Sequence, residues 1–222
     1  MKIAISGTQC IGKSTFIQDF IKQWPMYKVA GSSCSSLIKE KNIKHSQESS
    51  EETQNVILNH LVDQTLSFSK SEHILFDRCV LDNLAYTTWL SLKEKISGDY
   101  LKTVVPIVRE TLKLYDIIFL FPITKVSPVD ITDNGTRDID PVFREEIDNV
   151  FKAFCESYHK HDRKIFDPSD SPAIIEIFGK PEERIKMAEL YINEEGNMYG
   201  EDESLIQLPA EYDPELQEYY KY

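Results

Sequence analysis

The sequence predicts a P-loop NTPase of the α/β class, a three-layer sandwich whose central sheet is five-stranded, mostly parallel, covered by helices on both faces and closed by a mobile lid. Three observations lead to this expectation. Strand-like and helix-like segments alternate along the chain, a glycine loop separates the first two of them, and 222 residues suit one such domain. We expect one α/β domain over residues 1–193, with the lid at about 125–141, and an acidic tail over 194–222.

Each element is expected from its pattern of apolar residues. Short apolar runs predict buried strands, and apolar residues three or four apart predict helices. The most apolar run, residues 117–121, is expected at the centre of the sheet. The small, polar residues 31–36 predict a loop, while Asp140 and Pro141 are suited to the cap and first turn of a helix. The expected strands are 3–5, 27–30, 73–76, 117–121 and 173–178, and the other expected helices are 14–24, 48–68, 81–95, 100–115 and 182–192.

Composition and charge limit the classes of partner. The formal net charge of -12 disfavours extended nucleic acid unless positive side chains gather in one groove. No apolar run reaches the roughly 18 residues of a membrane span, and residues 1–6 lack the apolar stretch of a signal peptide. The four cysteines and five histidines lack the spacing of a zinc site. We therefore expect free thiols and a cytoplasmic location, in the host if a phage encodes the chain, whereas the oligomeric state stays open.

The glycine loop carries the clearest chemical signal. Its sequence, GTQCIGKS from Gly7 to Ser14, matches the phosphate-loop pattern at every fixed position. Lys13 would bring charge to the transferring phosphate as a catalytic residue, and the hydroxyl of Ser14 would bind magnesium. ATP, or another nucleoside triphosphate, and Mg²⁺ are the expected cofactors. The residues expected to bind the nucleotide are Gly7, Thr8, Gly12, Lys13, Ser14 and Thr15.

An acid and a base follow the third expected strand, at Asp77 and Arg78. Ligands of open α/β sheets gather at the carboxyl ends of strands, so Asp77 is expected in the catalytic centre. It could hold magnesium or accept a proton from the attacking hydroxyl, or it could merely cap the next helix. Arg78 is a candidate for substrate binding or for an ion pair with a neighbouring acid.

Further candidate residues come from two later segments. Asp82 and Tyr86 follow Arg78 at four-residue intervals, so a helix would place all three on one face beside the loop, as candidate substrate contacts. Arg137 lies in the expected lid and is the candidate that brings catalytic positive charge over the triphosphate. Arg144, on the helix after the lid, is a further candidate for substrate binding.

Three motifs together suggest a family. In the segments ISGTQCIGKST, FDRCVLDNLAY and DNGTRDIDPVFREEID, the chain resembles the P-loop kinases that include the nicotinamide riboside kinase domain of NadR and small phage-encoded kinases of nucleosides and nucleotides. The resemblance implies an ATP-dependent kinase or NTPase, with Gly12, Lys13 and Ser14 on phosphate and magnesium, Asp77 at the reacting centre and Arg137 in the lid. Relatives commonly carry Glu and Arg after the second strand, where residues 31–36 read GSSCSS.

The leading functional hypothesis is a phosphotransferase that moves the γ-phosphoryl group of ATP to a nucleoside, a nucleotide or a related small metabolite. One alternative is a nucleotide-dependent switch or binding module, which would not need Asp77 beside an acceptor pocket. A second alternative is a kinase that acts on modified bases in DNA, for which Lys39, Lys41 and Lys44 could provide a local basic groove.

Overall fold

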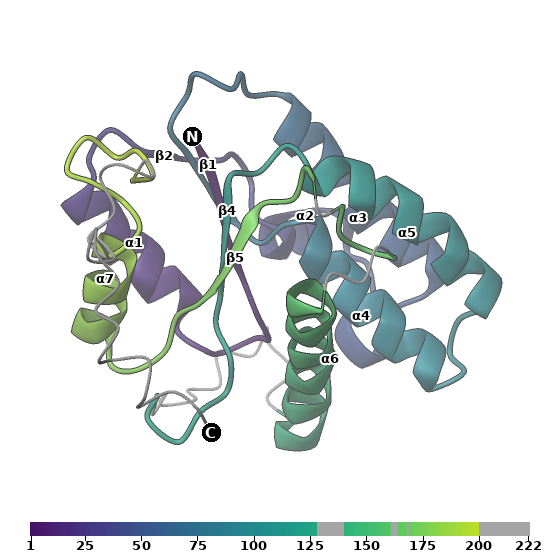
Figure 1. Cartoon of the computed structure of the whole chain (residues 1–222). Helices are drawn as coiled ribbons and strands as arrows, with labels where there is room; N and C mark the ends of the chain where they lie inside the picture. The colour runs from purple at the N-terminus through teal and green to yellow at the C-terminus, as the bar shows by residue number, and fades with distance from the viewer. Residues whose placement is uncertain (128–139, 161–163, 168, 200–222) are drawn as a thin grey trace, which may run out of the picture.

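The computed structural model describes residues 1–127, 140–160, 164–167 and 169–199. Its centre is a five-stranded sheet in the order β2-β3-β1-β4-β5, in which every neighbouring pair is parallel. The strands end at the lower side of Figure 1, and helices cover both faces of the sheet. The predicted three-layer α/β fold is confirmed. The strands are β1 Lys2–Ser6, β2 Lys28–Val29, β3 Ile74–Asp77, β4 Ile117–Leu120 and β5 Ala173–Glu176.

The middle strand is β1, and all five of its residues are buried. Ile3 is in register with Leu75 of β3 on one side and with Ile117 of β4 on the other. The run expected at the sheet centre forms β4, which lies beside β1 and is also buried throughout. Helices on both faces exclude water from these strands, so their sequences are apolar without alternation.

The helices form two unequal layers. One face of the sheet carries α1 and α7, and the other carries the remaining helices (Figure 1). Apolar residues of α1 and α7 pack against one face of the sheet, whereas residues of α2 to α6 form a larger core against the other face. The bounds are α1 Lys13–Gln23, α2 Cys34–Lys41, the 3-10 helix η1 Ser46–Glu48, α3 Glu51–Leu66, α4 Val80–Leu92, α5 Gly98–Leu112, α6 Pro141–His159 and α7 Pro181–Glu189.

One local prediction is wrong. Residues 31–36 were expected to form a loop, but α2 begins at Cys34. The hydroxyl of Ser33 accepts a hydrogen bond from the backbone N–H of Ser36 at 3.2 Å, so the serine cluster that resembles a loop is a helix start. Burial of Cys34 and Leu37 fixes the short helix against the core. Local composition failed here because serine favours loops and helix caps alike.

The start of α6 agrees with its prediction. The carboxylate of Asp140 accepts hydrogen bonds from the backbone N–H groups of Val142 and Phe143, and Pro141 stands in the first turn. Most of the expected lid, residues 128–139 including Arg137, lies outside the described residues. Within the described part, no helix combines the length and the hydropathy needed to span a membrane.

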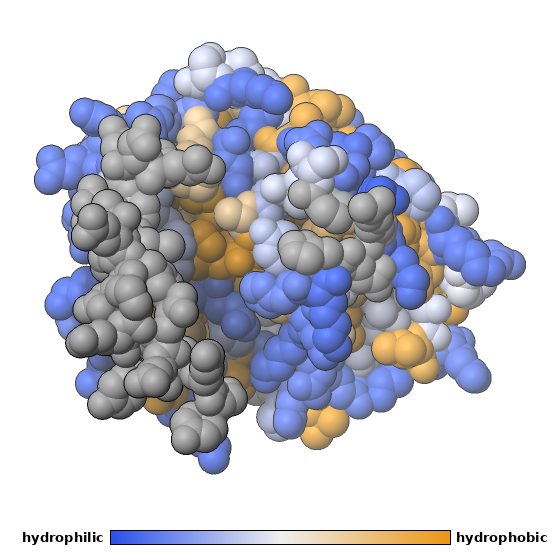
Figure 2. All heavy atoms as spheres, in the orientation of Figure 1, coloured by the Kyte–Doolittle hydropathy of each residue, from blue (hydrophilic) through white to orange (hydrophobic). Residues whose placement is uncertain are grey.

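Residues just beyond position 193 pack on the sheet domain. The hydroxyl of Tyr27 donates a hydrogen bond to the carbonyl oxygen of Gly196 at 2.7 Å, and Ile192 and Met198 form an isolated antiparallel bridge. Hydrophilic side chains cover most of the face in Figure 2, and hydrophobic ones show mainly in the hollow over β5, between the two helix layers. The apolar groups thus gather at the sheet and along its seams with the helices.

Candidate functional site

The phosphate loop joins the end of β1 to the start of α1 at the carboxyl edge of the sheet. Gly7 and Gly12 have positive φ angles of 134° and 87°. A Cβ atom at Gly7 would lie 2.6 Å from the carbonyl oxygen of Phe121, and one at Gly12 would lie 2.7 Å from a guanidinium nitrogen of Arg184. Both positions therefore require glycine for backbone conformation and for space. The backbone N–H groups at the start of α1 give this loop the partial positive charge that attracts phosphate.

Lys13 lies inside this loop. Its ammonium donates hydrogen bonds to the carbonyl oxygens of Gly7 at 2.8 Å and Thr8 at 2.5 Å. The side chain is buried, whereas Ser14 and Thr15, one and two residues later, are exposed. Thr8 is also buried, and its hydroxyl donates to the amide oxygen of Gln9. The structure thus places a charged nitrogen among the backbone groups of the loop and two hydroxyl-bearing residues at the helix start.

Two buried arginines hold the outside of the loop, and we call them the arginine clamp: Arg144 of α6 and Arg184 of α7. Arg144 donates to the carbonyl oxygens of Gln9 and Cys10, both at 3.0 Å. Arg184 donates to the carbonyl oxygen of Ile11 at 2.9 Å. Hydrogen bonds from charged donors are stronger than neutral ones, so the clamp fixes three consecutive loop carbonyls.

Of the two arginines in the clamp, the sequence analysis selected one as a candidate site residue and not the other. Arg144 was predicted to contact the substrate; in the structure its guanidinium bonds to loop carbonyls, and the contact with a substrate stays a prediction. Arg184 was missed, because nothing in its local sequence distinguishes it from a surface charge on a helix. Its guanidinium also donates to the carbonyl oxygen of Gly179 and lies 5.0 Å from the ring centre of Phe121. Burial lowers the pKa of Arg184.

Asp82 is the centre of the contacts behind the loop. Its carboxylate accepts hydrogen bonds from the hydroxyl of Ser6 at 2.7 Å, the backbone N–H of Cys79 at 3.0 Å and the guanidinium of Arg78 at 2.9 Å. A longer contact of 3.4 Å reaches the backbone N–H of Gly7. Asp82 is only 2% exposed, so these protein groups surround it almost completely. Its observed contacts join α4 to the start of the loop.

Arg78 and Asp77 occupy the turn between β3 and α4. Arg78 has a φ angle of 82°, an unusual conformation for a residue with a side chain, and its guanidinium lies 5.5 Å from the ring centre of Tyr86. Burial lowers the pKa of Arg78, but its negatively polarised neighbours, with Tyr86 and Asp82 the strongest, raise the pKa by more than burial lowers it. The guanidinium therefore stays charged. Asp77 is in register with Ile5 of β1 and is half-buried. The strained turn thus presents an acid and a base at the edge beside the loop.

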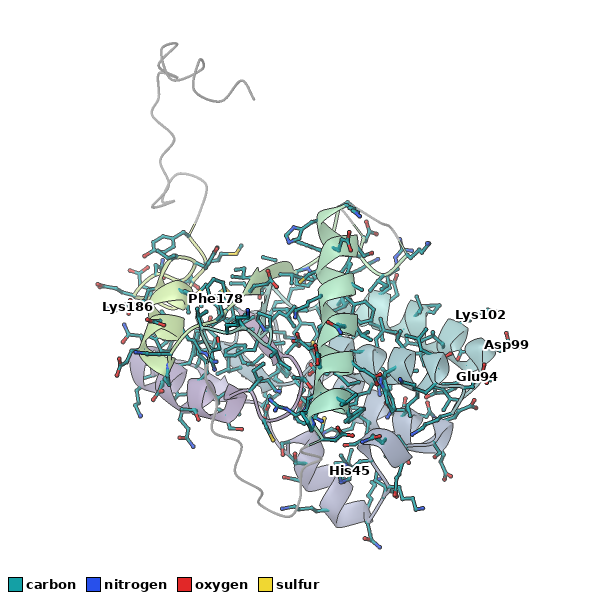
Figure 3. The ribbon with its side chains drawn as sticks, turned by 90° about the horizontal axis from the view of Figure 1, so that it is seen from below. His45, Glu94, Asp99, Lys102, Phe178 and Lys186 are labelled. Atoms are coloured by element: carbon teal, nitrogen blue, oxygen red, sulfur yellow. The ribbon has the colours of Figure 1, made fainter. Side chains whose placement is uncertain are left out.

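A cavity of about 390 Å³ connects the loop with helices on the larger layer. The lining residues of the loop, with Ser14 and Thr15, form what we call its near end, and Asp77, Arg78 and Tyr86 also line it. Small-molecule sites commonly fall in this size range. Figure 3 views the molecule from below, toward the carboxyl edge of the sheet, and shows Glu94 after α4 and Asp99 and Lys102 at the start of α5 on one side of the molecule, away from His45. The far end is lined by Cys34, Ser35, Ile38, Lys39, Asn42, Ile43, His45, Ser46, Ser49, Gln54, Ile57, Leu61 and Asn83.

The structure brings eight of the predicted site residues together along this cavity, and their chemical roles stay predictions: Gly12, Lys13, Ser14, Thr15, Asp77, Arg78, Asp82 and Tyr86. Tyr86, predicted from helical spacing, lines the cavity and donates from its hydroxyl to the amide oxygen of Gln9 at 2.5 Å. The far end was missed, because its residues come from α2, η1, α3 and α4 without any motif. Burial raises the pKa of Cys34 at this end to about 12, so its thiol is protonated at neutral pH.

Magnesium would find hard oxygen ligands here, because the hydroxyl-bearing Ser14 and the carboxylate of Asp77 line one cavity. Within the described residues, no group of three His, Cys, Asp or Glu side chains is placed to hold a metal. Such a cage is not needed for Mg²⁺ beside a nucleotide, since it keeps several waters and uses phosphate oxygens with one or two protein ligands. The residues present therefore fit magnesium bound together with a triphosphate.

Comparison with known proteins supplies the family. Residues 2–168 match the family model AAA_28, described as an AAA domain, and this segment contains the loop, the strained turn and α6. The chain belongs to this family. No curated protein matches the sequence.

Solved structures share the fold of this AAA_28 chain at low sequence identity. NadR in complex with NR superposes with a TM-score of 0.59 at 12% identity, over 85% of this chain and 50% of that one. Thymidylate kinase from Candida albicans gives 0.56 at 15%, over 85% and 89%. Deoxyadenosine kinase from M. mycoides with bound dATP gives 0.54 at 16%, over 79% and 90%. The chain spans only about half of the NadR protein. The predicted resemblance to P-loop kinases is confirmed for the fold.

Proposed function

We propose that this protein is an ATP-dependent kinase that transfers the γ-phosphoryl group to a nucleoside, a nucleotide or a related small metabolite. The observation that carries this proposal is that one cavity is lined by the phosphate loop, by Asp77 and by residues of α2, α3 and α4. A protein that only senses a nucleotide needs no second compartment beyond the phosphates. The folds of the NadR, thymidylate kinase and deoxyadenosine kinase structures support the same reading.

In the proposed reaction, an acceptor oxygen forms a bond to the γ-phosphorus while the bond to the β–γ bridging oxygen breaks, and ADP leaves. Lys13 and the backbone N–H groups of the loop would stabilise the charge on the phosphate oxygens. For a hydroxyl acceptor, the carboxylate of Asp77 would take its proton. Mg²⁺, held by Ser14 and Asp77, would neutralise charge on the triphosphate when bound. Arg137 and Arg144 remain candidates for added positive charge.

A phosphate-transfer screen with γ-labelled ATP tests the proposal. The acceptors are nucleosides, deoxynucleoside monophosphates, nicotinamide riboside and a short oligonucleotide with modified bases. We expect a labelled product with at least one small acceptor, and none with the oligonucleotide, because the net charge of -12 opposes a polyanion. ATP hydrolysis without transfer to any acceptor would favour the nucleotide switch instead. Labelling of the oligonucleotide would favour the kinase of modified bases.

A further inference from the structure

Two amide side chains at the far end of the cavity bond to each other and still leave polar groups without a hydrogen-bond partner among the described residues. Asn83 of α4 and Gln54 of α3 both line the cavity wall, and each is only 2% exposed. The amide nitrogen of Asn83 donates to the backbone carbonyl oxygen of Gln54 and to its side-chain oxygen, both at 2.9 Å. The side-chain oxygen of Gln54 also accepts from the hydroxyl of Thr87 at 3.3 Å.

These contacts fix which end of each amide is which. A backbone carbonyl can only accept, so the end of Asn83 that faces it must be the NH₂ group. The atom of Gln54 that receives the second N–H of Asn83 must then be its oxygen. The amide oxygen of Asn83 and the amide NH₂ group of Gln54 thus take no part in the hydrogen bonds between these two residues.

The amide oxygen of Asn83 is buried without a hydrogen-bond partner among the described residues. The amide nitrogen of Gln54 likewise makes no hydrogen bond within the described part of the chain. The hydroxyl of Ser49, also on the cavity wall, is a second buried atom without a described partner. A buried polar atom left unpaired costs about 1–3 kcal/mol, so the amide oxygen of Asn83 and the hydroxyl of Ser49 point to a ligand that pairs with them.

The chemistry of that ligand follows from the free atoms. Asn83 offers an acceptor and Gln54 offers a donor, so the matching group presents an N–H beside an acceptor atom. Both amides are neutral, and a carboxylate or phosphate would meet the oxygen of Asn83 as a like partial charge. Ile57 and Leu61 of α3 line the same part of the wall and suit a flat apolar body. Lys39 and Arg78, which would suit an anion, line the cavity on other elements.

We infer that Asn83 and Gln54 form a subsite for a planar group of the phosphoryl acceptor, such as a nucleobase edge or a carboxamide. An N–H of this group donates to the amide oxygen of Asn83. An adjacent acceptor atom of the same group receives an N–H of Gln54. This inference rests on the proposed function, and it names the part of the acceptor that is recognised. The two residues would determine specificity, whereas Asp77, at the end of β3, is the residue proposed at the transferring group.

The first test uses the unmodified protein. Each acceptor that the screen finds is compared with an analogue methylated so that the edge keeps its shape but loses every N–H, such as N4,N4-dimethylcytidine beside cytidine. We expect kcat/KM to fall by about 100-fold or more, because a site built to bond an N–H rejects a ligand that lacks it. Parent and analogue within about threefold of each other would overturn the subsite, since bound water would then satisfy Asn83 as well as a ligand does.

Two variants give a second, independent test. Gln54→Glu keeps the oxygen that Asn83 and Thr87 need but replaces the free NH₂ group with an acceptor, and Asn83→Leu removes the free oxygen. We expect each variant to raise KM for the acceptor by about 10-fold or more while ATP affinity stays unchanged, and Asn83→Leu to phosphorylate parent and methylated analogue equally well. Asn55→Leu, at an exposed position on α3, is the matched control and should behave as the wild type.

Direct binding separates this inference from the proposed function. Titration calorimetry of parent compounds and methylated analogues needs no turnover. Selective binding of the parents without phosphoryl transfer would keep the subsite and refute the kinase, and transfer without selectivity would refute only the subsite. Absence of binding by every nucleoside, nucleotide and carboxamide would overturn both. If Asn83→Leu does not fold, Gln54→Glu and the analogue series still decide the matter.

Discussion

The two ends of the cavity are built in opposite ways. At the near end, the phosphate loop is one short segment whose conformation depends on Gly7 and Gly12 and on the clamp formed by Arg144 and Arg184. At the far end, the side chains come from four separate helices and from the segments between them. Backbone groups bind a phosphate that all nucleoside triphosphates share, whereas side chains distinguish one acceptor from another. The comparison teaches that the proposed phosphate site is encoded by neighbouring residues, whereas the proposed acceptor specificity depends on residues far apart in the chain.

The largest effect is expected at the near end. Lys13→Ala should lower the rate of phosphoryl transfer by about 10³-fold or more, because a single cation on the transferring group has effects of this size. The far end should still bind its acceptor, which calorimetry would show. Lys22→Ala is the matched control, since Lys22 lies on the same helix but is paired with Asp19 at the surface. Retained turnover in a folded Lys13→Ala protein would remove the phosphate loop from the mechanism.

Asp77 lines the same cavity as both ends, and its loss should give the next largest effect. Asp77→Asn should lower kcat by about 10²- to 10³-fold, because a positioned proton acceptor contributes that much. ATP affinity should change little, since both predicted roles act mainly during transfer. Asp99→Asn at the distant turn is the control, because Asp99 is exposed there. Wild-type kcat in Asp77→Asn would leave Asp77 as a structural residue of the turn.

Arg184→Ala should weaken only the near end. Its charged hydrogen bond holds the carbonyl of Ile11, and loss of such a bond costs about 1.5–2 kcal/mol, or about 10- to 30-fold in ATP affinity. Fluorescence titration with a labelled ATP analogue measures this change, and acceptor binding should stay constant. Arg109→Ala is the control, because Arg109 lies on α5 and its guanidinium is 4.0 Å from Asp167, which does not line the cavity. Equal losses for ATP and acceptor would mean that Arg184 supports the whole fold.

The smallest effect is expected where the two ends touch. Tyr86 lines the cavity and donates to Gln9 of the phosphate loop, so Tyr86→Phe removes one neutral hydrogen bond between them. We expect about a 3- to 10-fold change in how strongly bound ATP affects acceptor binding, measured by calorimetry with and without a non-hydrolysable ATP analogue. Tyr100→Phe is the control, because the hydroxyl of Tyr100 has no described partner. An unchanged coupling would show that the two ends act independently.

Sequence patterns were enough for the layers of the fold. Continuous apolar runs placed the strands, helical spacing placed most helices, and Asp140 with Pro141 marked the start of α6. These signals succeed because they depend on residues close together in the chain. The serines before Leu37 misled, because a serine that caps a helix and a serine in a loop have the same local chemistry.

In the candidate site, too, residues within a short motif were predictable and residues joined by long-range contacts were not. Gly12, Lys13 and Ser14 were readable because the chemistry of the phosphate loop demands fixed residues at fixed spacing. The roles of Arg144 and Arg184 at the loop carbonyls, and the pairing of Gln54 with Asn83, follow from contacts between residues 29 to 173 positions apart. Such contacts depend on how helices pack across a sheet, and no short motif records that packing. The sequence therefore predicted a phosphate site, whereas the packing of distant helices created the rest of the cavity, where we propose that an acceptor binds.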